Sequence, residues 1–317
     1  MIYRAPGKIV LWGEYAVLSG APAAVAAVDR YATVQLIPAD NSWSFVSEGF
    51  LTPGLHNFSG RFTSAPVAAM AEQVLRHFEL SRFPDGFSLA SDTAPFYHQN
   101  ADSSTAPDKY GLGSSAALCV ATYCALADLL GRDKTLVDAL AIHRAFQHGK
   151  GSGLDVGASW QGGYIRFQNG RVSTQLFPDT LYWRAVWTGA SAATGRALGH
   201  FAQWQAAADT EPLERLAAAS TLMSHEPSLA NLTAYTRNLA RLDDAANLNI
   251  FTPAHRRLAT MAAAHGLVYK PCGAGGGDIG IAVGEDADAL RQFCTQAALE
   301  EFVPLNLEIA PHGVQAH

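Results

Sequence analysis

The sequence lacks any long apolar run. Its longest apolar stretch, residues 21–28, contains Pro22 and ends at Asp29-Arg30, far short of the roughly 20 residues that a membrane-spanning helix needs. The apolar stretch at residues 9–12 is too short for the core of a signal peptide. We therefore expect a soluble, cytoplasmic protein with no membrane partner.

Basic runs and paired cysteines are also missing. The chain has 22 Lys and Arg against 28 Asp and Glu, a net charge of −6, so we expect no nucleic-acid partner, because such surfaces are strongly basic. The 4 cysteines show no spacing typical of a zinc site or a redox motif, which predicts buried, reduced thiols. No pair of histidines has metal-ligand spacing, and we expect His143, His148, His255 and His265 at the surface or at helix ends.

What is present is a globular composition of 317 residues, 49% hydrophobic and 16% charged. A single core stops growing at about 250 to 300 residues, so two fused lobes are predicted. The N-terminus is rich in strand patterns, the middle is helical, and the last third alternates helix and strand, which indicates the α+β class. We place the boundary near Ala190, giving units 1–190 and 191–317.

Periodicity predicts the individual elements. Strands are expected at residues 2–12, 26–37, 43–46, 86–90, 163–167, 183–187, 267–270, 279–283 and 303–309, those at 163–167 and 183–187 closing the first lobe. Helices are expected at residues 66–80, starting at Pro66, then 114–130, 134–147, much of 194–241, 253–265 and 286–298. The polar segment 91–109 lacks periodicity and predicts a long functional loop that orders over bound substrate.

A glycine-rich segment, Lys-Tyr-Gly-Leu-Gly-Ser-Ser-Ala-Ala at residues 109–117, leads from that loop into a helix. Free amide groups and the positive end of the helix dipole would converge there, as in a phosphate cradle. Lys109 would add a mobile cation, and the hydroxyls of Ser114 and Ser115 are oxygen ligands of the kind that Mg²⁺ prefers.

Simpler interpretations of this segment stay open at this point. Serine before an alanine-rich helix is a common N-cap, and Gly-Leu-Gly could be a plain tight turn. Gly111, Gly113 and Ala116 fit the dinucleotide fingerprint G-x-G-x-x-A, but that motif must follow a core strand, and here a polar loop precedes it. A P-loop is excluded, because neither Gly7-Lys8 nor Gly149-Lys150 is followed by Ser or Thr.

Three further segments place small residues where a backbone would approach a ligand. Residues 150–158 (KGSGLDVGA) deliver Asp155 to the start of a predicted helix, where an acidic residue is also favoured by the dipole alone. Residues 272–278 (CGAGGGD) join two predicted strands and exceed what a hairpin turn needs. Residues 5–18 (APGKIVLWGEYAVL) place Lys8 and Glu14 at the two ends of an apolar strand, where surface ion pairs are the usual explanation.

Together and in this order, the four segments resemble those of the GHMP small-molecule kinases, from Ala5 to about Val283. Within that family the opening segment looks like the mevalonate-pathway members, and the Lys109-Tyr110 pair and the Gly-Ala-Gly-Gly-Gly-Asp run are most similar to phosphomevalonate kinases. The resemblance implies the GHMP fold, with an N-terminal lobe like ribosomal protein S5 domain 2 that binds ATP and a ferredoxin-like C-terminal lobe.

The resemblance also implies roles for particular residues. Asp155 and Lys8 would be catalytic, Asp155 orienting or deprotonating the acceptor and Lys8 reducing charge in the transition state. Ser115 would ligate Mg²⁺. ATP would be bound by Lys109, Gly111, Leu112, Gly113, Ser114, Ser115 and Ala116. The phosphate acceptor would be bound by Lys8, Glu14, Tyr15, Lys109, Ser152, Gly153, Ala274, Gly275 and Gly276.

The implied activity is ATP-dependent phosphorylation of (R)-5-phosphomevalonate to 5-diphosphomevalonate, with ATP and Mg²⁺ as cofactors and a monomer or homodimer as the assembly. The alternative is mevalonate kinase or another GHMP kinase acting on a hydroxyl. Mevalonate kinases carry a Mg²⁺-binding Glu about eleven residues before the catalytic Asp, and residues 144–154 contain no acidic residue, which weakens that alternative. A non-catalytic nucleotide-binding protein would not need Lys8, Lys109 and Asp155 together.

Overall fold

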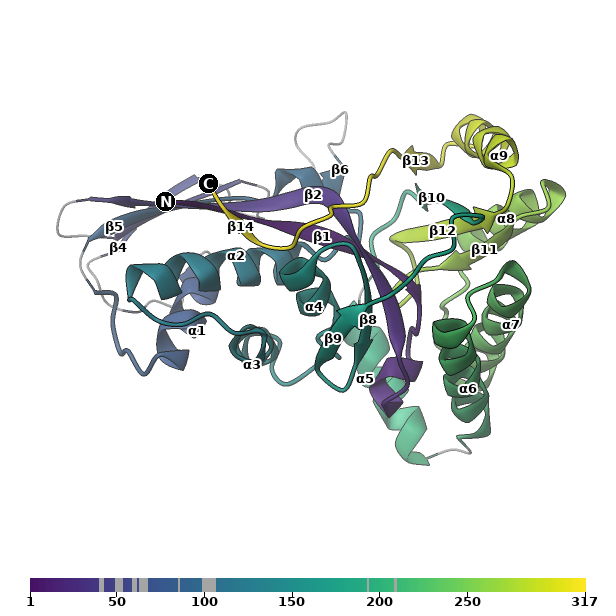
Figure 1. Cartoon of the computed structure of the whole chain (residues 1–317), viewed down its shortest axis with the longest axis horizontal. Coiled ribbons are helices and arrows are strands. Elements are labelled where there is room, and N and C mark those ends of the chain that lie inside the picture. Colours follow the sequence, from purple (N-terminus) through teal and green to yellow (C-terminus); the bar gives the residue numbers. More distant parts are fainter. Residues whose placement is uncertain are drawn as a thin grey trace.

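The protein, described here from a computed structural model, has two sheets that lie at opposite ends of the molecule (Figure 1). The structure describes residues 1–39, 43–48, 54–58, 62, 68–84, 86–98, 107–192, 194–207 and 210–317. The larger sheet has eight strands in the order β14-β1-β2-β5-β3-β4, with β8 and β9 attached to β2. The smaller has four, in the order β11-β12-β10-β13. A two-stranded ribbon, β6-β7, completes the set.

The strands of the larger sheet and the ribbon come mostly from the first half of the chain. They are β1 (Ile2–Trp12), β2 (Ala23–Pro38), β3 (Trp43–Glu48), β4 (Gly54–Phe58), β5 (Phe87–Asp92), β6 (Tyr97–His98), β7 (Asp108–Lys109), β8 (Tyr164–Gln168), β9 (Arg171–Thr174) and β14 (Gln315–Ala316). The smaller sheet is formed by β10 (Tyr182–Trp187), β11 (Val268–Pro271), β12 (Ile279–Gly284) and β13 (Val303–Leu305).

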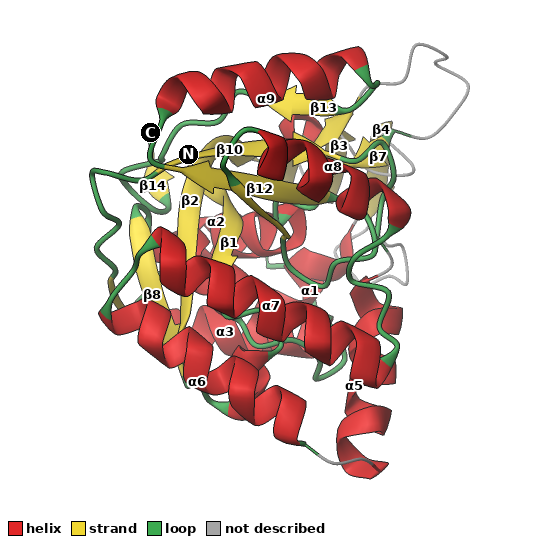
Figure 2. Ribbon diagram, turned by 90° about the vertical axis from the view of Figure 1, so that its right-hand side faces the viewer, coloured by secondary structure: helices red, strands yellow, loops and turns green. Residues whose placement is uncertain are grey.

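Helices cover one face of the larger sheet and pack around the smaller one (Figures 1 and 2). The α-helices are α1 (Ala69–His77), α2 (Ser114–Leu129), α3 (Leu136–Phe146), α4 (Leu154–Gln161), α5 (Thr194–Ala207), α6 (Glu211–His225), α7 (Leu229–Ala246), α8 (Pro253–Ala264) and α9 (Ala287–Leu299), and short 3-10 turns occur at η1 (Ala16–Ser19) and η3 (Ala94–Phe96). Within the described residues, no helix combines the length and the apolarity needed to span a bilayer.

Helix α2 is the central helix of the first lobe. Twelve of its residues, from Ala116 to Ala127, are buried, and a helix that is apolar all round belongs inside a core. It ends at Leu129, within one residue of the predicted end, with Leu130 as the C-cap and Gly131 next in a left-handed conformation. Its fixed position matters for function, because it aims its N-terminus at the candidate site.

Most predicted elements are confirmed, with two differences. The loop predicted at 91–109 is partly ordered: β5 extends to Asp92, η3 follows, and β6 pairs with β7. The predicted helix start at Pro66 and residues 99–106 of the loop lie outside the described residues, so the predicted ordering on substrate stays untested.

The second difference concerns the strand predicted at 183–187. It does not close the first lobe, because β10 lies in the smaller sheet and pairs with β12 and β13. At the other end of the chain, β14 returns to pair with β1 of the larger sheet, so the two termini lie side by side (Figure 1). The division at residue 190 stays a prediction.

Candidate active site

Lys8 joins the first strand to the glycine-rich segment. Its backbone N–H donates to the Leu112 carbonyl at 2.8 Å, and its ammonium donates to the Gly111 carbonyl at 3.0 Å. Its stem lies across Gly113, since a Cβ added there would be 3.1 Å from Cγ of Lys8. The half-buried Lys8 is therefore fixed at the point where the predicted phosphate loop turns into α2.

The start of α2 offers unpaired amides. Its N-cap is Gly113, with a φ of 80° and no side-chain cap, so the interpretation of Ser114 as a serine N-cap is wrong. No described residue accepts a hydrogen bond from the amide of Ser114 or Ser115. These amides and the partial positive charge of about +0.5 at a helix N-terminus suit an anion.

Helix α4 begins in the same way beside Lys8. Its N-cap is Gly153, with a φ of 87° and no side-chain cap, and Asp155 lies in its first turn. The Asp155 carboxylate accepts from the Val156 amide at 3.0 Å and stays partly exposed. Ser152, just before the helix, accepts from the Leu154 amide at 3.4 Å. The glycine turn thus presents one carboxylate to the pocket described next.

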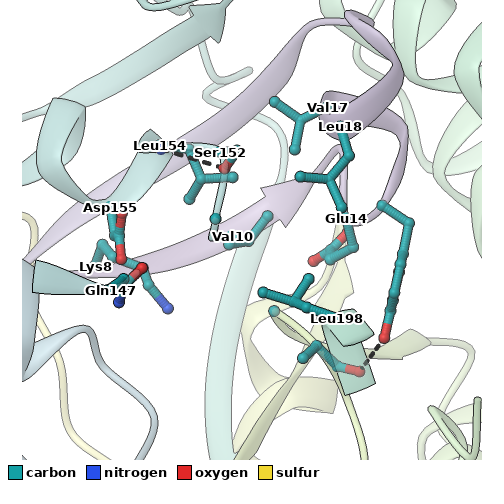
Figure 3. A pocket seen from close by; sticks show the side chains of 14 residues that line it. Lys8, Val10, Glu14, Val17, Leu18, Gln147, Ser152, Leu154, Asp155 and Leu198 are labelled. Carbon is teal, nitrogen blue, oxygen red and sulfur yellow. Dashed lines mark hydrogen bonds between the residues drawn. The ribbon is translucent and has the colours of Figure 1, made fainter. Parts of the chain in front are cut away.

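A pocket of about 140 Å³ lies between the two lobes and contains both predicted catalytic residues. Figure 3 shows Lys8, Asp155 and Gln147 grouped at one end. The remaining lining is mostly apolar or backbone: Val10, Glu14, Tyr15, Val17, Leu18, Gly151, Ser152, Leu154, Leu198, Gly273 and Ala274. A ligand with a charged end and an apolar body matches this distribution.

The second lobe contributes its glycine run to one wall of the pocket. The Tyr15 hydroxyl donates to the Ala274 carbonyl at 2.6 Å, and burial raises the pKa of Tyr15, so it stays a donor. Gly275 has a φ of 69° and packs on Ile250, with a Cβ position 2.7 Å from the Ile250 Cα. The exposed Gly276 donates from its amide to the Ile250 carbonyl at 3.2 Å.

Asp278, which follows that run, contacts the phosphate loop. A Cβ on Gly111 would lie 2.6 Å from the Asp278 carboxyl group, which also accepts from the Ala192 amide at 2.8 Å. Burial raises the pKa of Asp278, opposed by the Ala192 hydrogen bond and by the cations Lys8 and Lys109. The sequence motif contains Asp278, but nothing in the spacing indicated that its side chain would reach the other lobe.

Lys109 is exposed at the end of β7. Its amide donates to the Ser191 hydroxyl at 2.8 Å, and its ammonium lies 5.9 Å from the centre of the Tyr97 ring. Its charge acts on Asp278, so Lys109 and Lys8 lie near the same carboxylate. Both predicted cations therefore belong to one region between the lobes.

Glu14 lines the pocket, and its predicted role in binding the acceptor stays a prediction, but its carboxylate already has partners within the protein. Its side chain is 1% exposed, and both carboxylate oxygens are engaged: Lys270 donates to one at 2.5 Å and Tyr235 to the other at 2.7 Å. Glu14 therefore belongs to the pocket wall, while its carboxylate is turned to the buried contacts that join the lobes. Lys270, fully buried on β11, gave no signal in the sequence, because a single Lys in a strand is usually at the surface.

The histidine expectation is also partly wrong. His143, on α3, is 2% exposed, and its Nε2 lies 3.1 Å from the Ser115 hydroxyl. His255 is fully buried between Tyr269 and the Gly277 carbonyl. Hydrophobic periodicity predicts that a residue lies in a helix, but it does not reveal whether a buried polar group is present to bond its side chain.

The donors present suit a divalent cation that arrives with phosphates. Ser115 offers a hydroxyl and Asp155 a carboxylate, whereas no group of three His, Cys, Asp or Glu that could hold a metal occurs in the described part of the chain. Mg²⁺ typically keeps several waters and uses one or two protein oxygens plus substrate phosphates. The residues fit such an ion.

The structure brings most of the predicted site residues together. Lys8, Glu14, Tyr15, Ser152, Asp155 and Ala274 line the pocket. Lys8 connects it to the segment of Gly111, Leu112, Gly113, Ser114, Ser115 and Ala116. The sequence did not indicate Gln147 and Leu198 as lining residues, since they lie in helical or turn segments with no motif.

Comparison with known proteins places this geometry in a family. Residues 67–163 match the model of the GHMP kinases N terminal domain. The chain is 31% identical to a phosphomevalonate kinase of Streptomyces sp. strain CL190, over 92% of each protein. It is 27% identical to a mevalonate kinase of Thermococcus sibiricus, over 54% of this chain and 52% of that protein.

Solved structures agree on the fold. The chain resembles Streptococcus pneumoniae phosphomevalonate kinase in complex with phosphomevalonate and AMPPNP, with a TM-score of 0.78 and 19% identity, over 98% of this chain and 99% of that one. A crystal structure titled mevalonate kinase gives a TM-score of 0.74 at 16% identity, over 98% and 100% of the two chains. The predicted α+β, two-lobe fold is confirmed.

Proposed function

The chain belongs to the GHMP kinase family and is an ATP-dependent phosphotransferase of the mevalonate pathway, and we propose that its acceptor is (R)-5-phosphomevalonate, which it converts to 5-diphosphomevalonate. One observation carries this proposal. The similarity to the Streptomyces phosphomevalonate kinase extends over 92% of both proteins, whereas that to the Thermococcus sibiricus mevalonate kinase covers 54% of this chain. Only the first of these two matches therefore extends over nearly the whole chain.

In this proposal the start of α2 holds ATP. The amides of the segment from Gly111 to Ala116 face the phosphates, with Lys109 beside them and the glycine run at Ala274, Gly275 and Gly276 opposite. The Ser115 hydroxyl would hold Mg²⁺, which supplies positive charge to the phosphate oxygens when bound. Phosphoryl transfer depends mostly on such positioning and charge stabilisation.

The acceptor occupies the pocket with its phosphate toward Lys8. The γ-phosphorus of ATP loses its bond to the ADP oxygen and gains one to an acceptor phosphate oxygen. A phosphate acceptor is already largely ionised near neutral pH, because its second pKa is about 6, so Asp155 orients it rather than needing to remove a proton. The phosphates of ATP and of the acceptor are both anionic and repel each other. Replacing Lys8 or Lys109, whose charges offset this repulsion, should therefore reduce activity most.

Side chains around the pocket would set its shape for this acceptor. Val10, Val17 and Leu198 give an apolar wall suited to a hydrocarbon body, and Ser152, Gly153 and Tyr15 give the polar contacts. Glu14 contributes indirectly, by fixing Lys270 behind the wall. The assembly is proposed to be a monomer or homodimer, and the units 1–190 and 191–317 remain our proposed domains.

The test measures ADP release with Mg·ATP and phosphomevalonate, mevalonate or no acceptor, with the product mass determined in each case. We expect turnover only with phosphomevalonate and a large loss in Lys109→Ala. Arg132→Ala is the matched control, because Arg132 is an exposed cation just past the C-terminal end of α2. The 16 residues of α2 separate it from the phosphate loop by roughly 24 Å, at about 1.5 Å per residue.

Turnover with mevalonate instead would contradict the proposed acceptor and support the alternative, a kinase that phosphorylates a hydroxyl. In that case Asp155→Asn should lose more activity than Lys109→Ala, because a hydroxyl needs its proton removed whereas a phosphate does not. Equal turnover without any acceptor would indicate ATP hydrolysis and contradict both.

A further inference from the structure

His143 is a buried polar side chain with no place in the proposed mechanism. It lies on α3, next to the buried Ile142, and is 2% exposed. Buried polar groups in native proteins are hydrogen-bonded, and the partner here is the Ser115 hydroxyl, 3.1 Å from Nε2. The contact therefore connects α3, which does not line the phosphate loop, with the first turn of α2.

Ser115 lies in the first turn of α2, so its hydroxyl has no carbonyl of the same helix to bond. Hydroxyls further along a helix commonly donate to the carbonyl four residues earlier, as those of Thr221 and Ser224 do in α6. Four residues before Ser115 is Gly111, which precedes the helix and whose carbonyl accepts from the Lys8 ammonium at 3.0 Å. The hydroxyl is directed to His143, and the Gly111 carbonyl is left to Lys8.

A hydroxyl has one proton to donate and two lone pairs to offer. If the proton is directed to His143, both lone pairs of the Ser115 oxygen stay available to other partners. If the imidazole donated instead, one lone pair would be used. The direction of this hydrogen bond thus decides how well Ser115 can ligate a cation.

Apart from Asp155, this stretch of the chain offers the ion no carboxylate. Residues 144–154, between His143 and Asp155, contain no acidic residue, and no metal-holding group of three His, Cys, Asp or Glu exists among the residues that the structure describes. His143 itself is a poor candidate ligand, because Mg²⁺ is a hard ion that takes oxygen ligands. With so few protein oxygens available to the ion, the orientation of the Ser115 hydroxyl matters.

We propose that His143 is a positioning residue, whose Nε2 accepts the Ser115 proton and turns the Ser115 oxygen toward the Mg²⁺ that accompanies ATP. This inference rests on the proposed function, specifically on Ser115 as a metal ligand. It requires the neutral imidazole with its proton on Nδ1. A packing role alone, holding α3 against α2, would need neither that tautomer nor any link to the metal.

The test measures AMPPNP binding by calorimetry with and without Mg²⁺, which requires no turnover. The readout is the factor by which Mg²⁺ improves affinity. We expect His143→Ala to lower that factor about three- to tenfold, the size of one hydrogen bond, while affinity without Mg²⁺ stays nearly the same. His143→Gln should restore most of it, because the Gln oxygen can take the place of Nε2.

The matched control is Ile142→Ala, which removes buried packing from the same turn of α3 without touching a polar contact. An equal loss of the Mg²⁺ factor in this variant would overturn the proposal in favour of packing. In the double variant Ser115→Ala/His143→Ala, we expect no loss beyond that of Ser115→Ala. Additive losses would show that His143 acts by another route.

The outcomes also separate this inference from the function on which it rests. If Ser115→Ala leaves the Mg²⁺ factor unchanged, the proposed metal role of Ser115 fails. If Ser115→Ala lowers it and His143→Ala does not, only the positioning role fails. Independently, the ¹⁵N shifts of the His143 ring should show protonated Nδ1 and unprotonated Nε2, and the opposite tautomer would overturn the proposal.

Discussion

At the scale of single residues, Lys8 is the central side chain of the site. Its ammonium is tied to the Gly111 carbonyl and its stem is held against Gly113, so its charge is already placed before substrates bind. A preorganised charge costs no reorganisation during the reaction. This is why a flexible side chain can act as a fixed element of the site.

We expect Lys8→Ala to lower kcat by about 10²- to 10³-fold, the usual cost of one charge-stabilising group. The free energy of unfolding should change little, because the lost hydrogen bond is only half-buried. Steady-state kinetics and urea unfolding of the same preparation check both statements. A loss confined to KM, with kcat unchanged, would mean that Lys8 only binds substrate.

Gly111 is the residue of the phosphate loop that lies against Asp278. Its φ is +85°, and a Cβ would meet the Asp278 carboxyl at 2.6 Å. Gly111→Ala should lower stability by about 1–3 kcal/mol through the left-handed backbone and should also weaken AMPPNP binding severely, because Asp278 must shift.

Gly131→Ala separates these two effects. Gly131 ends the same helix with a φ of +62°, but a Cβ there would meet nothing within 4 Å. It should therefore show the backbone cost while keeping full nucleotide affinity. If both variants lose affinity equally, contact with Asp278 is not what makes Gly111 necessary. Calorimetric titration with AMPPNP, alongside thermal unfolding, gives both quantities.

Residue types alone predicted part of this site. Gly111, Gly113 and Asp155 could be found, because left-handed turns before helices need glycine and the motif fixes their spacing. His143, Lys270 and the buried position of Glu14 could not, since each depends on a partner far away in the chain. A charged or polar residue in a sequence gives no sign of whether a distant partner allows its burial.

At the scale of elements, α8 and the glycine run are linked through His255. Its Nδ1 lies 2.9 Å from the Tyr269 hydroxyl and its Nε2 lies 3.0 Å from the Gly277 carbonyl. The Gly277 carbonyl can only accept, so Nε2 carries a proton, and in the neutral ring the Tyr269 hydroxyl donates to Nδ1. Burial lowers the pKa of His255 to about 4, opposed by the Gly277 hydrogen bond and helped by Lys270.

The shifted pKa of His255 makes the free energy of unfolding depend on pH in a definite direction. Between about pH 6.5 and pH 4 the unfolded chain binds a proton at His255 and the folded chain does not, so the free energy of unfolding falls as pH falls. The loss should reach about 3 kcal/mol near pH 4, at about 1.4 kcal/mol per unit of pKa difference. Urea unfolding at a series of pH values measures it.

The contribution of His255 is isolated by comparison with His255→Gln, which cannot titrate. The difference between the two proteins should change by about 3 kcal/mol across that window. His265→Gln, which removes a half-buried histidine just past the same helix, should keep the dependence of the original protein. A His255→Gln curve parallel to the original would contradict the assignment.

Element positions were largely predictable because hydrophobic periodicity is local. Sheet membership was not: the pattern of β10 (Tyr182–Trp187) is the same whichever sheet it joins, and its partners β12 and β13 lie about 100 residues later in the sequence. The same holds for β14, which is two residues long and pairs with β1 across the whole chain.

At the scale of the whole molecule, the site exists because two lobes are held together by buried polar contacts. Lys270 of the second lobe bonds Glu14 and the Val10 carbonyl, and Tyr235 bonds Glu14 and the Gly13 amide. These contacts lie directly behind the pocket wall that Glu14 and Tyr15 form. The lobe arrangement and the pocket shape therefore depend on the same side chains.

We expect removal of one member of the buried pair to be severe. Lys270→Met leaves a buried carboxylate at Glu14 without its cation, which should lower the free energy of unfolding by about 3–5 kcal/mol. Glu14→Gln leaves the Lys270 ammonium uncompensated, with a similar cost. Each should also raise the KM for the acceptor, because the pocket wall loses its support.

The double variant Glu14→Gln/Lys270→Met decides whether the charges or only the packing matter. With no charge left buried, it should regain most of the stability that either single change removes, whereas purely steric damage would add up. Lys134→Met is the control: it breaks the partly exposed Lys134–Asp128 pair, a kind of ion pair worth at most about 1 kcal/mol, together with the contact of Lys134 with Tyr3. Urea unfolding of the original protein, the two single variants and the double variant measures the cycle, with Lys134→Met alongside. Additive losses would mean that shape rather than charge joins the lobes, and the pocket would then tolerate any apolar pair that fills the same volume.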